Sequence, residues 1–597
     1  MCNEPVKWFF SACGGPLLFR IWRVFKNRKI DLIVLLLVCF AAFWWRLGTL
    51  GLIDPDEPFY AQTAREMVQS GDWVTPQIYG EPQFEKPIFY YWLVAASFKV
   101  LGETEFAGRM PATLFATILT LLVWWFASRV WNARAGFLSA LVLATGLEFC
   151  VMSRLMLTDV PLATFIAGSV FCYWMAVREE EHRDKWMFWH LVWAGFAVLT
   201  KGPLGSLVTV MATVAFSLGT KRGLLFRGRG FWWGVLAYAV IVVPWYAAMF
   251  TWYAKPFWEE FFIRDNWMRV LEAEHPSNNH IWYYPGLLLL GSLPWMPAVA
   301  LTVRRAWGRL REDEAAFFQW CWLLTSLVFL TICQSKIPSY AFYLFVPLAV
   351  LVGRTLDQLL ARGFASAGER RLVIGFAVFQ CAVVGLFAVL TYVEVGPIPS
   401  ASWLAGKTAS LTRTLRPFEV PVLMVFACLV VSLVFLVRKN LTTWLLASST
   451  ASLALLVGAL TVALPAVEAE SSARPVAQML MRERRGDEPL LTGKFLARGI
   501  IYYTNTDVRA AEPTVRVLAK KAQPFWAPHP IPVVVWKKGL REFLKEHPSA
   551  LCALRKGDWR GFEKEEAFTA RDAFAEFGEN VVVRALRTPA PVVAPPE

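Results

Sequence analysis

The acidic run Asp54-Pro55-Asp56-Glu57 is the part of this sequence whose residue types are best suited to chemistry. Further ionisable residues follow at Glu85-Lys86, Asp159, Lys201 and Lys336. Carboxylates can act as general bases or bind cations, whereas Lys and Arg side chains can hold a phosphate. Beside a bilayer, this combination favours group transfer from a lipid-linked phosphate, with the leaving phosphate stabilised electrostatically.

Several of these residues also have a structural explanation. Asp56 could N-cap a helix that starts at Glu57, Glu85 and Lys86 could form a solvated pair, and Asp159 could cap the apolar segment that follows it. However, Asp159, Lys201 and Lys336 all fall at the predicted outer ends of membrane spans. Ionisable groups near membrane depth are costly, and they usually line a cavity or pair with one another. Their convergence on one face favours an active site.

The composition predicts a membrane protein. Of 597 residues, 56% are hydrophobic and only 18% are charged, whereas a soluble protein carries about a quarter charged residues. Apolar stretches of about 17–22 residues recur, each long enough to cross a bilayer as a helix. The net charge of +14 lies mostly in short loops, where the positive-inside rule expects it, so nucleic acid is not expected as a partner.

The apolar stretches divide the chain into predicted regions. Basic residues before the first stretch place residues 1–29 in the cytoplasm. Residues 30–463 form a transmembrane domain whose largest external loops are 49–110 and 250–281. At Lys201-Gly202-Pro203 we expect a turn between two spans, because one long helix would move the basic loop 220–230 outside. The predicted spans, about thirteen in number, are 30–48, 111–128, 135–151, 160–177, 186–200, 203–219, 231–249, 282–302, 316–333, 337–353, 372–392, 418–436 and 441–463.

From residue 464 the composition becomes that of an ordinary globular protein. The segments 531–536 and 581–583 are typical of strands, and 471–484 and 538–546 are typical of amphipathic helices. We therefore predict an α/β domain over 464–587 and a Pro-rich disordered tail over 588–597. An odd number of spans places this domain outside. The expected fold class is an all-α polytopic membrane domain of about 13 transmembrane helices with a C-terminal soluble α/β domain.

Short motifs over most of residues 30–350 resemble, in order, the polyprenyl-phosphate-dependent glycosyltransferases of the GT-C class. They are most similar to the bacterial lipid A aminoarabinose transferase family, and the protein O-mannosyltransferases are more distant. The ordered set is specific, although each motif alone is weak. The motifs are Pro55-Asp56-Glu57 with Tyr60-Ala61, Arg65-Glu66-Met67, Ser70-Gly71-Asp72-Trp73, Phe84-Glu85-Lys86-Pro87, Leu157-Thr158-Asp159, Thr200-Lys201-Gly202, Gly291-Ser292-Leu293-Pro294-Trp295 and Ser335-Lys336-Ile337-Pro338-Ser339-Tyr340.

The resemblance implies a pentosyl- or hexosyltransferase in the bacterial inner membrane, monomeric, with its active site on the periplasmic side. It would move a sugar, with inversion, from an undecaprenyl-phosphate-linked donor to an envelope lipid or glycan, such as lipid A. Protein O-glycosyl or mannosyl transfer is an alternative in the same class. A lipid or sugar transporter without chemistry is the alternative from another class, but it would place ionisable groups near the midplane and often show internal repeats; no repeat is evident.

The resemblance and the topology together assign roles to residues of this chain. Asp56 would position or activate the acceptor, supported by the other catalytic carboxylates, Glu57 and Asp159. Glu85 would bind a divalent metal (Mg, Mn or Zn) or shape the site. The other candidates are a donor-phosphate set, Lys86, Arg269, Tyr340, Lys201 and Lys336, and two residues of the donor and acceptor pocket, Tyr60 and Tyr343.

Two departures from the family pattern bear on the substrate. Pro58-Phe59 stands where the aminoarabinose enzymes usually have Thr-Arg, which removes a cation beside Asp56. Asp265-Asn266 stands where that family often has Glu-His, which removes a potential metal ligand. A carboxylate-bound Mg²⁺ or no metal therefore both remain open, as do the sugar and the acceptor.

Overall fold

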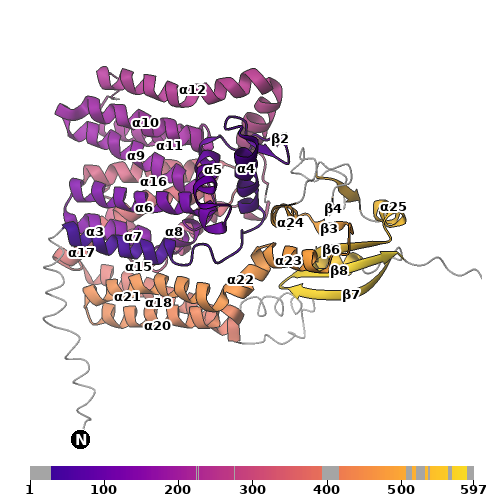
Figure 1. Cartoon of the computed structure of the whole chain (residues 1–597). Helices are drawn as coiled ribbons and strands as arrows, with labels where there is room; N and C mark the ends of the chain where they lie inside the picture. Colours follow the sequence, from indigo (N-terminus) through magenta and orange to yellow (C-terminus); the bar gives the residue numbers. More distant parts are fainter. Residues whose placement is uncertain are drawn as a thin grey trace, which may run out of the picture.

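The computed structural model describes residues 28–223, 225, 227–274, 276–392, 416–505, 514–519, 531–535, 538–562 and 568–587. Nearly all of the predicted cytoplasmic segment and the whole predicted tail lie outside these residues. The described chain forms a bundle of helices with a smaller α/β domain at one end (Figure 1). This arrangement confirms the predicted fold class.

The helices of the bundle account for the hydrophobic composition. Among the described residues, eight helical segments are long and apolar enough to cross a membrane. Each of the thirteen predicted spans falls on helix, but several are too short, too charged or too broken to be among the eight. The eight segments are Glu105–Val130, Asp159–Arg178, Arg229–Leu271, Glu314–Ile332, Pro338–Arg362, Ala367–Thr391, Arg416–Val437 and Leu441–Ser471.

Proline and glycine positions explain where predicted spans break. The segment predicted as 282–302 forms two helices separated at Pro294, which has no N–H to donate to a helix. A turn separates α10 (Arg183–Lys201) from α11 (Leu204–Thr220), as predicted, and Gly202 in this turn has a left-handed backbone (φ 85°) that favours glycine. The helices are α3 (Arg28–Cys39), α6 (Glu105–Val130), α7 (Ala133–Ala144), α8 (Leu147–Met152), α9 (Asp159–Arg178), α10 (Arg183–Lys201), α11 (Leu204–Thr220), α14 (Tyr283–Gly291), α15 (Met296–Ala306), α16 (Glu314–Ile332), α17 (Phe345–Arg362), α18 (Ala367–Tyr392), α20 (Glu419–Val437) and α21 (Leu441–Gly458).

Two segments predicted as external loops contain helices that carry candidate site residues. In the first loop, α4 (Asp56–Ser70) and α5 (Phe89–Leu101) flank a short hairpin of β1 (Gln77–Ile78) and β2 (Glu81–Pro82). In the second, α12 (Arg229–Phe257) continues as the π-helix η3 (Trp258–Met268) and α13 (Arg269–Leu271). A kink at Ala254, beside Pro256, changes the direction of this long helix. Helix therefore replaces loop through Leu271.

The C-terminal domain starts later in the chain than the change of composition at residue 464 predicts. The helix from Leu441 runs on through η7 (Ala459–Ala463) and α22 (Leu464–Ser471), past the predicted boundary at 464. A six-stranded sheet follows in the order β5-β4-β3-β6-β8-β7, parallel from β5 to β6 and antiparallel at β8 and β7. Its strands are β3 (Leu490–Gly493), β4 (Val515–Ala519), β5 (Val533–Val535), β6 (Ser549–Arg555), β7 (Phe568–Phe577) and β8 (Asn580–Arg587), with helices α23 (Arg474–Glu483), α24 (Ala497–Thr504), α25 (Lys538–Glu546) and α26 (Lys556–Phe562).

One helix of this domain reaches the first external loop. α24 packs against α4, the helix that begins at Asp56, and Figure 1 shows the two beside each other at the junction of the bundle and the domain. The residue before α4 is Pro55, and α4 has no side-chain N-cap hydrogen bond. Asp56 is thus the first residue of the helix and not its cap, so the capping explanation of this carboxylate is wrong.

Candidate active site

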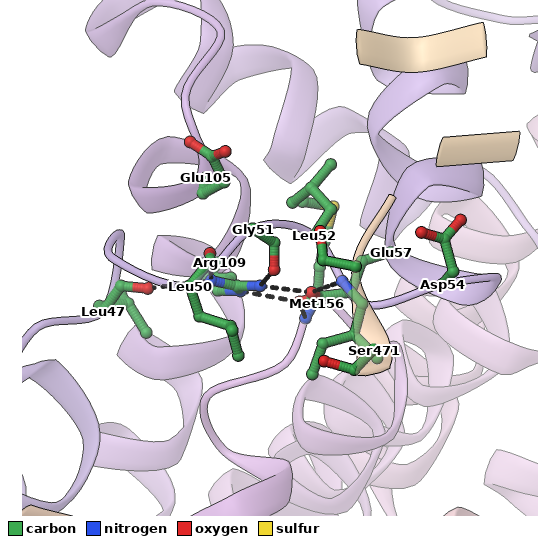
Figure 2. A network of polar contacts seen from close by, with 12 residues as sticks. Leu47, Leu50, Gly51, Leu52, Asp54, Glu57, Glu105, Arg109, Met156 and Ser471 are labelled. Atoms are coloured by element: carbon green, nitrogen blue, oxygen red, sulfur yellow. Dashed lines mark hydrogen bonds and ion pairs between the residues drawn. The ribbon is translucent and has the colours of Figure 1, made fainter. Parts of the chain in front are cut away.

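Glu57 of the acidic run is committed to a buried structural network. Its carboxylate accepts hydrogen bonds from Arg109 Nε (2.9 Å) and Nη2 and from the backbone N–H groups of Ile53 and Met156 (both 2.7 Å). Both charged side chains are 2% exposed. Arg109 also donates to backbone carbonyls of the segment before α4, as Figure 2 shows. These contacts favour a structural role for Glu57 over the predicted catalytic one.

Asp54 joins the same run to the C-terminal domain. Its carboxylate accepts hydrogen bonds from the backbone N–H groups of Ala473 (2.8 Å) and Gly499 (2.9 Å). Its own backbone N–H donates to the carbonyl of Ser471 (2.8 Å). Burial raises the pKa of this carboxyl well above its usual range, whereas the two N–H donors lower it. Asp54 therefore anchors one part of the molecule to the other.

Asp56 differs from both neighbours. Its side chain is solvent-accessible, and among the described residues it makes no hydrogen bond or ion pair. Protein nevertheless surrounds the carboxylate closely, and this burial raises the pKa of Asp56; Arg498 and Lys86 oppose the shift, and Glu85 and Asp159 reinforce it. A carboxylate that is accessible, unpaired and less acidic than usual is suited to accept a proton or position a nucleophile.

Cations from two distant segments meet near Asp56 around one shared carboxylate, Asp265. Lys86 Nζ lies 3.1 Å from Asp265 Oδ2, and Arg269 Nη2 lies 3.5 Å from Oδ1. Arg269 Nη1 also donates to Tyr340 Oη (2.6 Å). Asp265 thereby orients two of the residues predicted to hold the donor phosphate, and Arg269 links a third, Tyr340, to them. In the sequence, Asp265 stands out only as a departure from the family pattern, although its spacing of four residues from Arg269 is that of a helical ion pair.

A second ion pair, between Lys201 and Asp159, lies close to these cations. Lys201 Nζ donates to Asp159 Oδ1 and lies 5.2 Å from the centre of the Tyr340 ring. Lys86 and Arg269 are close enough to repel the charge of Lys201. Burial raises the pKa of Tyr60 well above its usual range, and the nearby charges of Asp56 and Asp159 add to the shift.

The contacts therefore bring together Asp56, Tyr60, Lys86, Asp159, Lys201, Arg269 and Tyr340, which we call the charged cluster. Two predicted residues have other surroundings. Lys336 is buried, and its Nζ donates to Asn279 Oδ1 and to the carbonyl of Cys333 (both 2.6 Å), so it orders the segment after η3. Tyr343 is buried inside the bundle, 2% exposed.

Glu85 faces a cation that the sequence analysis did not identify. Arg498 Nη2, on α24 of the C-terminal domain, lies 3.6 Å from Glu85 Oε1, and the Arg498 side chain is 10% exposed. Its guanidinium also lies 4.6 Å from the centre of the Phe59 ring. No local pattern marks Arg498, because only the packing of α24 on α4 brings it here.

The predicted metal at Glu85 does not fit these surroundings. A guanidinium beside the carboxylate repels a divalent cation and occupies the carboxylate electrostatically. Within the described ranges, no group of three or more His, Cys, Asp or Glu residues is arranged to hold a metal ion. The nearby Asp265 is engaged by Lys86 and Arg269 instead. We therefore assign no step to a metal.

A cavity of about 400 Å³ lies elsewhere, where α9 ends and α10 and α16 begin. Arg178, Arg183, Arg222, Trp174 and Phe216 are among the residues that line it. It contains none of the predicted site residues, and the charged cluster is at the opposite ends of these helices. The chemistry proposed below does not involve it.

Sequence comparison relates the chain to proteins named as mannosyl and arabinosyl transferases. Residues 31–260 match the family model for dolichyl-phosphate-mannose-protein mannosyltransferase. The undecaprenyl phosphate-alpha-4-amino-4-deoxy-L-arabinose arabinosyl transferase of Erwinia tasmaniensis is 30% identical over 306 residues, covering 50% of this chain and 55% of that protein. The enzyme of the same name from Pseudomonas aeruginosa is 29% identical over 410 residues, covering 65% of this chain and 73% of the relative. The match thus spans little more than half of the Erwinia protein.

Comparison of structures extends the match to nearly the whole chain. The crystal structure of ArnT from Cupriavidus metallidurans bound to undecaprenyl phosphate superposes with a TM-score of 0.72 over 95% of this chain and 99% of that one, at 22% identity. Its apo state gives a TM-score of 0.69. At this identity the likeness shows a shared fold, which includes both the helical bundle and the C-terminal domain. These findings confirm the predicted resemblance: in sequence the chain is similar to the arabinosyl transferases, and in fold it is similar to ArnT.

Proposed function

We propose that the chain is a glycosyltransferase that moves a sugar from an undecaprenyl-phosphate-linked donor to an acceptor of the bacterial envelope. The enzyme would lie in the inner membrane with its charged cluster and C-terminal domain in the periplasm. The observation that carries the proposal is the placement of Asp56, an accessible carboxylate that makes no ion pair among the described residues, near Lys86 and Asp159. Lys86 shares Asp265 with Arg269, and Asp159 pairs with Lys201. The names of the related enzymes make aminoarabinose the first sugar to test and lipid A the first acceptor.

The charged cluster can supply what such a transfer requires. An acceptor oxygen attacks the anomeric carbon of the sugar while the bond from that carbon to the donor phosphate oxygen breaks. The leaving undecaprenyl phosphate takes the bonding electron pair and gains one negative charge. Lys86, Arg269 and Lys201 are positioned to stabilise this charge, and their carboxylate partners keep them oriented before the substrate binds.

Asp56 has a role that depends on the acceptor. A hydroxyl acceptor must lose a proton during the attack, and the raised pKa of Asp56 suits it to receive that proton. A phosphate acceptor is already ionised, so Asp56 would then orient the nucleophile through hydrogen bonds to the sugar or the acceptor. In both cases Asp56 must be in the ionised form to act.

The decisive experiment uses the purified full chain in lipid nanodiscs, with undecaprenyl-phosphate-linked aminoarabinose and lipid A, and detects product by mass spectrometry. We expect Asp56→Asn to lower transfer by a factor of about 10² or more without changing the melting temperature. Glu81→Gln, an exposed carboxylate in the same external loop, is the matched control and should keep full activity. Full activity in Asp56→Asn would refute the assignment, and movement of the donor across vesicles without product would favour the transporter.

A second candidate rests on the family model, whose description names protein mannosyltransferases. In that case the acceptor is a Ser or Thr hydroxyl of a protein. The same preparation, supplied with undecaprenyl-phosphate-linked mannose and a Ser/Thr-rich peptide, tests it directly. Glycopeptide formation together with unmodified lipid A would favour this candidate over the first.

A further inference from the structure

The C-terminal domain places two basic side chains at the edge of the charged cluster. Arg498 lies 3.6 Å from Glu85 and stacks on Phe59, and its charge acts on Asp56. Lys494 precedes α24 in the same segment. Burial lowers the pKa of Lys494, and the charge of Arg498 lowers it further, so the two cations lie close enough to repel each other.

The position of Arg498 is tightly determined. The residue that follows it, Gly499, donates its backbone N–H to Asp54, and a Cβ on Gly499 would lie only 2.4 Å from Asp54 Oδ2. Only glycine allows this approach of α24 to the acidic run. At the other end of α24, Arg65 of α4 donates to the carbonyl of Tyr502 (3.0 Å) and lies 3.8 Å from the centre of its ring. α24 therefore holds Arg498 in a fixed relation to Asp56.

The charges acting on Asp56 come from two separate parts of the molecule. Lys86 belongs to the first external loop and is oriented by Asp265 of η3, within the membrane domain. Arg498 belongs to the C-terminal domain and is paired with Glu85. Both cations act on the same carboxylate. Group transfer between two phosphates needs one cationic site for the leaving phosphate and a second for the attacking one, because a single site cannot hold both at once.

We propose that Arg498, with Lys494, binds a phosphate group of the acceptor and holds it beside Asp56, so that the C-terminal domain forms the acceptor side of the active site. This inference rests on the proposed function and deepens it by assigning residues of the C-terminal domain to the acceptor. A guanidinium suits this task because its planar N–H groups bind a phosphate in a bidentate manner. An acceptor phosphate oxygen would then form the new bond to the anomeric carbon as the donor phosphate leaves, with no net proton transfer.

The test measures binding by the full chain in nanodiscs with three probes: lipid A, enzymatically dephosphorylated lipid A, and undecaprenyl phosphate. Arg498→Gln should weaken the binding of lipid A by about tenfold to a hundredfold. It should change the affinity for the dephosphorylated form and for undecaprenyl phosphate by less than about twofold. Arg498→Lys should retain part of the affinity for lipid A. Arg482→Gln, an exposed arginine of the same domain, is the control and should bind all three probes like the wild type.

Glu85→Gln separates ligand binding from a purely structural role. It breaks the same ion pair as Arg498→Gln but removes a competing carboxylate, so lipid A should bind as tightly as before or more tightly. An equal loss of lipid A binding in both variants would show that the pair is structural and would overturn the proposal. So would equal binding of the two forms of lipid A by the wild type, or an unchanged affinity in Arg498→Gln.

These outcomes are separate from those of the proposed function. A wild type that binds lipid A through its phosphate but forms no glycosylated product would refute the glycosyltransferase function and leave the phosphate site in place. A wild type that glycosylates phosphorylated and dephosphorylated lipid A equally, and is unaffected by Arg498→Gln, would keep the function and refute the phosphate site.

Discussion

Glu57→Gln is the substitution that most directly distinguishes a structural carboxylate from a catalytic one in the acidic run. Each oxygen of Glu57 accepts two hydrogen bonds: Oε1 from Arg109 Nε and Met156 N, and Oε2 from Arg109 Nη2 and Ile53 N. An amide of the same shape can offer one oxygen only. Two of the four donors would face an NH₂ group, and the buried guanidinium would lose the charge that compensates it.

The expected magnitude follows from burial. Both side chains are 2% exposed, and removing one partner of a buried ion pair destabilises a protein by about 3–5 kcal/mol. This loss shifts the unfolding equilibrium by about a hundredfold or more. The carbonyls of Leu47, Leu50 and Gly51 still accept from Arg109, so the segment before α4 should stay ordered and the loss should lie near the lower end of this range.

The assay compares two isosteric variants of neighbouring residues. Unfolding of Glu57→Gln and Asp56→Asn is followed by SDS titration in mixed micelles, and transfer is measured per folded molecule at low temperature. We expect Glu57→Gln to lose stability but keep transfer, and Asp56→Asn to lose transfer but keep stability. Wild-type stability with abolished transfer in Glu57→Gln would refute this reasoning and restore Glu57 as a catalytic residue.

Three further predictions follow from the same contacts. Burial raises the pKa of Asp56 and the ionised form is the active one, so transfer should fall as the pH drops through this raised pKa. Arg498 lowers that pKa, so Arg498→Gln should move the acidic limb of the pH–rate profile to higher pH. An unmoved limb would contradict the placement of Arg498 near Asp56. Asp54→Ala should weaken the docking of the C-terminal domain by about 1–3 kcal/mol, seen as faster limited proteolysis near residue 473, whereas wild-type resistance would show that the two backbone N–H groups are satisfied elsewhere. Chelation by EDTA should leave transfer unchanged because Arg498 occupies the surroundings of Glu85; loss of activity restored by Mg²⁺, Mn²⁺ or Zn²⁺ would reinstate the metal.

The sequence by itself determined the class of the molecule and most of the residues of the charged cluster. Apolar stretches long enough to cross a bilayer, repeated along the chain, indicate membrane-spanning helices. Ionisable residues at the outer ends of these helices are costly unless they line a cavity or pair, which is why Asp159 and Lys201 could be expected on one face; the structure shows that they pair with each other. The motif around Asp56 was likewise readable from residue order alone.

Only the tertiary structure decided which carboxylate of the acidic run is available for chemistry. Asp54, Asp56 and Glu57 are adjacent in sequence, but Arg109 on α6 occupies Glu57 and the backbone of the C-terminal domain occupies Asp54. Spacing cannot predict such contacts, because both partners come from segments that pack against the run only in the folded protein.

The structure also changed the interpretation of Phe59. In the sequence, Phe59 stands where the aminoarabinose enzymes usually have an arginine, so a cation beside Asp56 is missing. In the folded chain, Arg498 stacks on the Phe59 ring and its charge reaches Asp56. Side-chain chemistry and local spacing are properties of the sequence, whereas the electrostatic field at Asp56 depends on distances between segments from opposite ends of the chain, and packing alone fixes those distances.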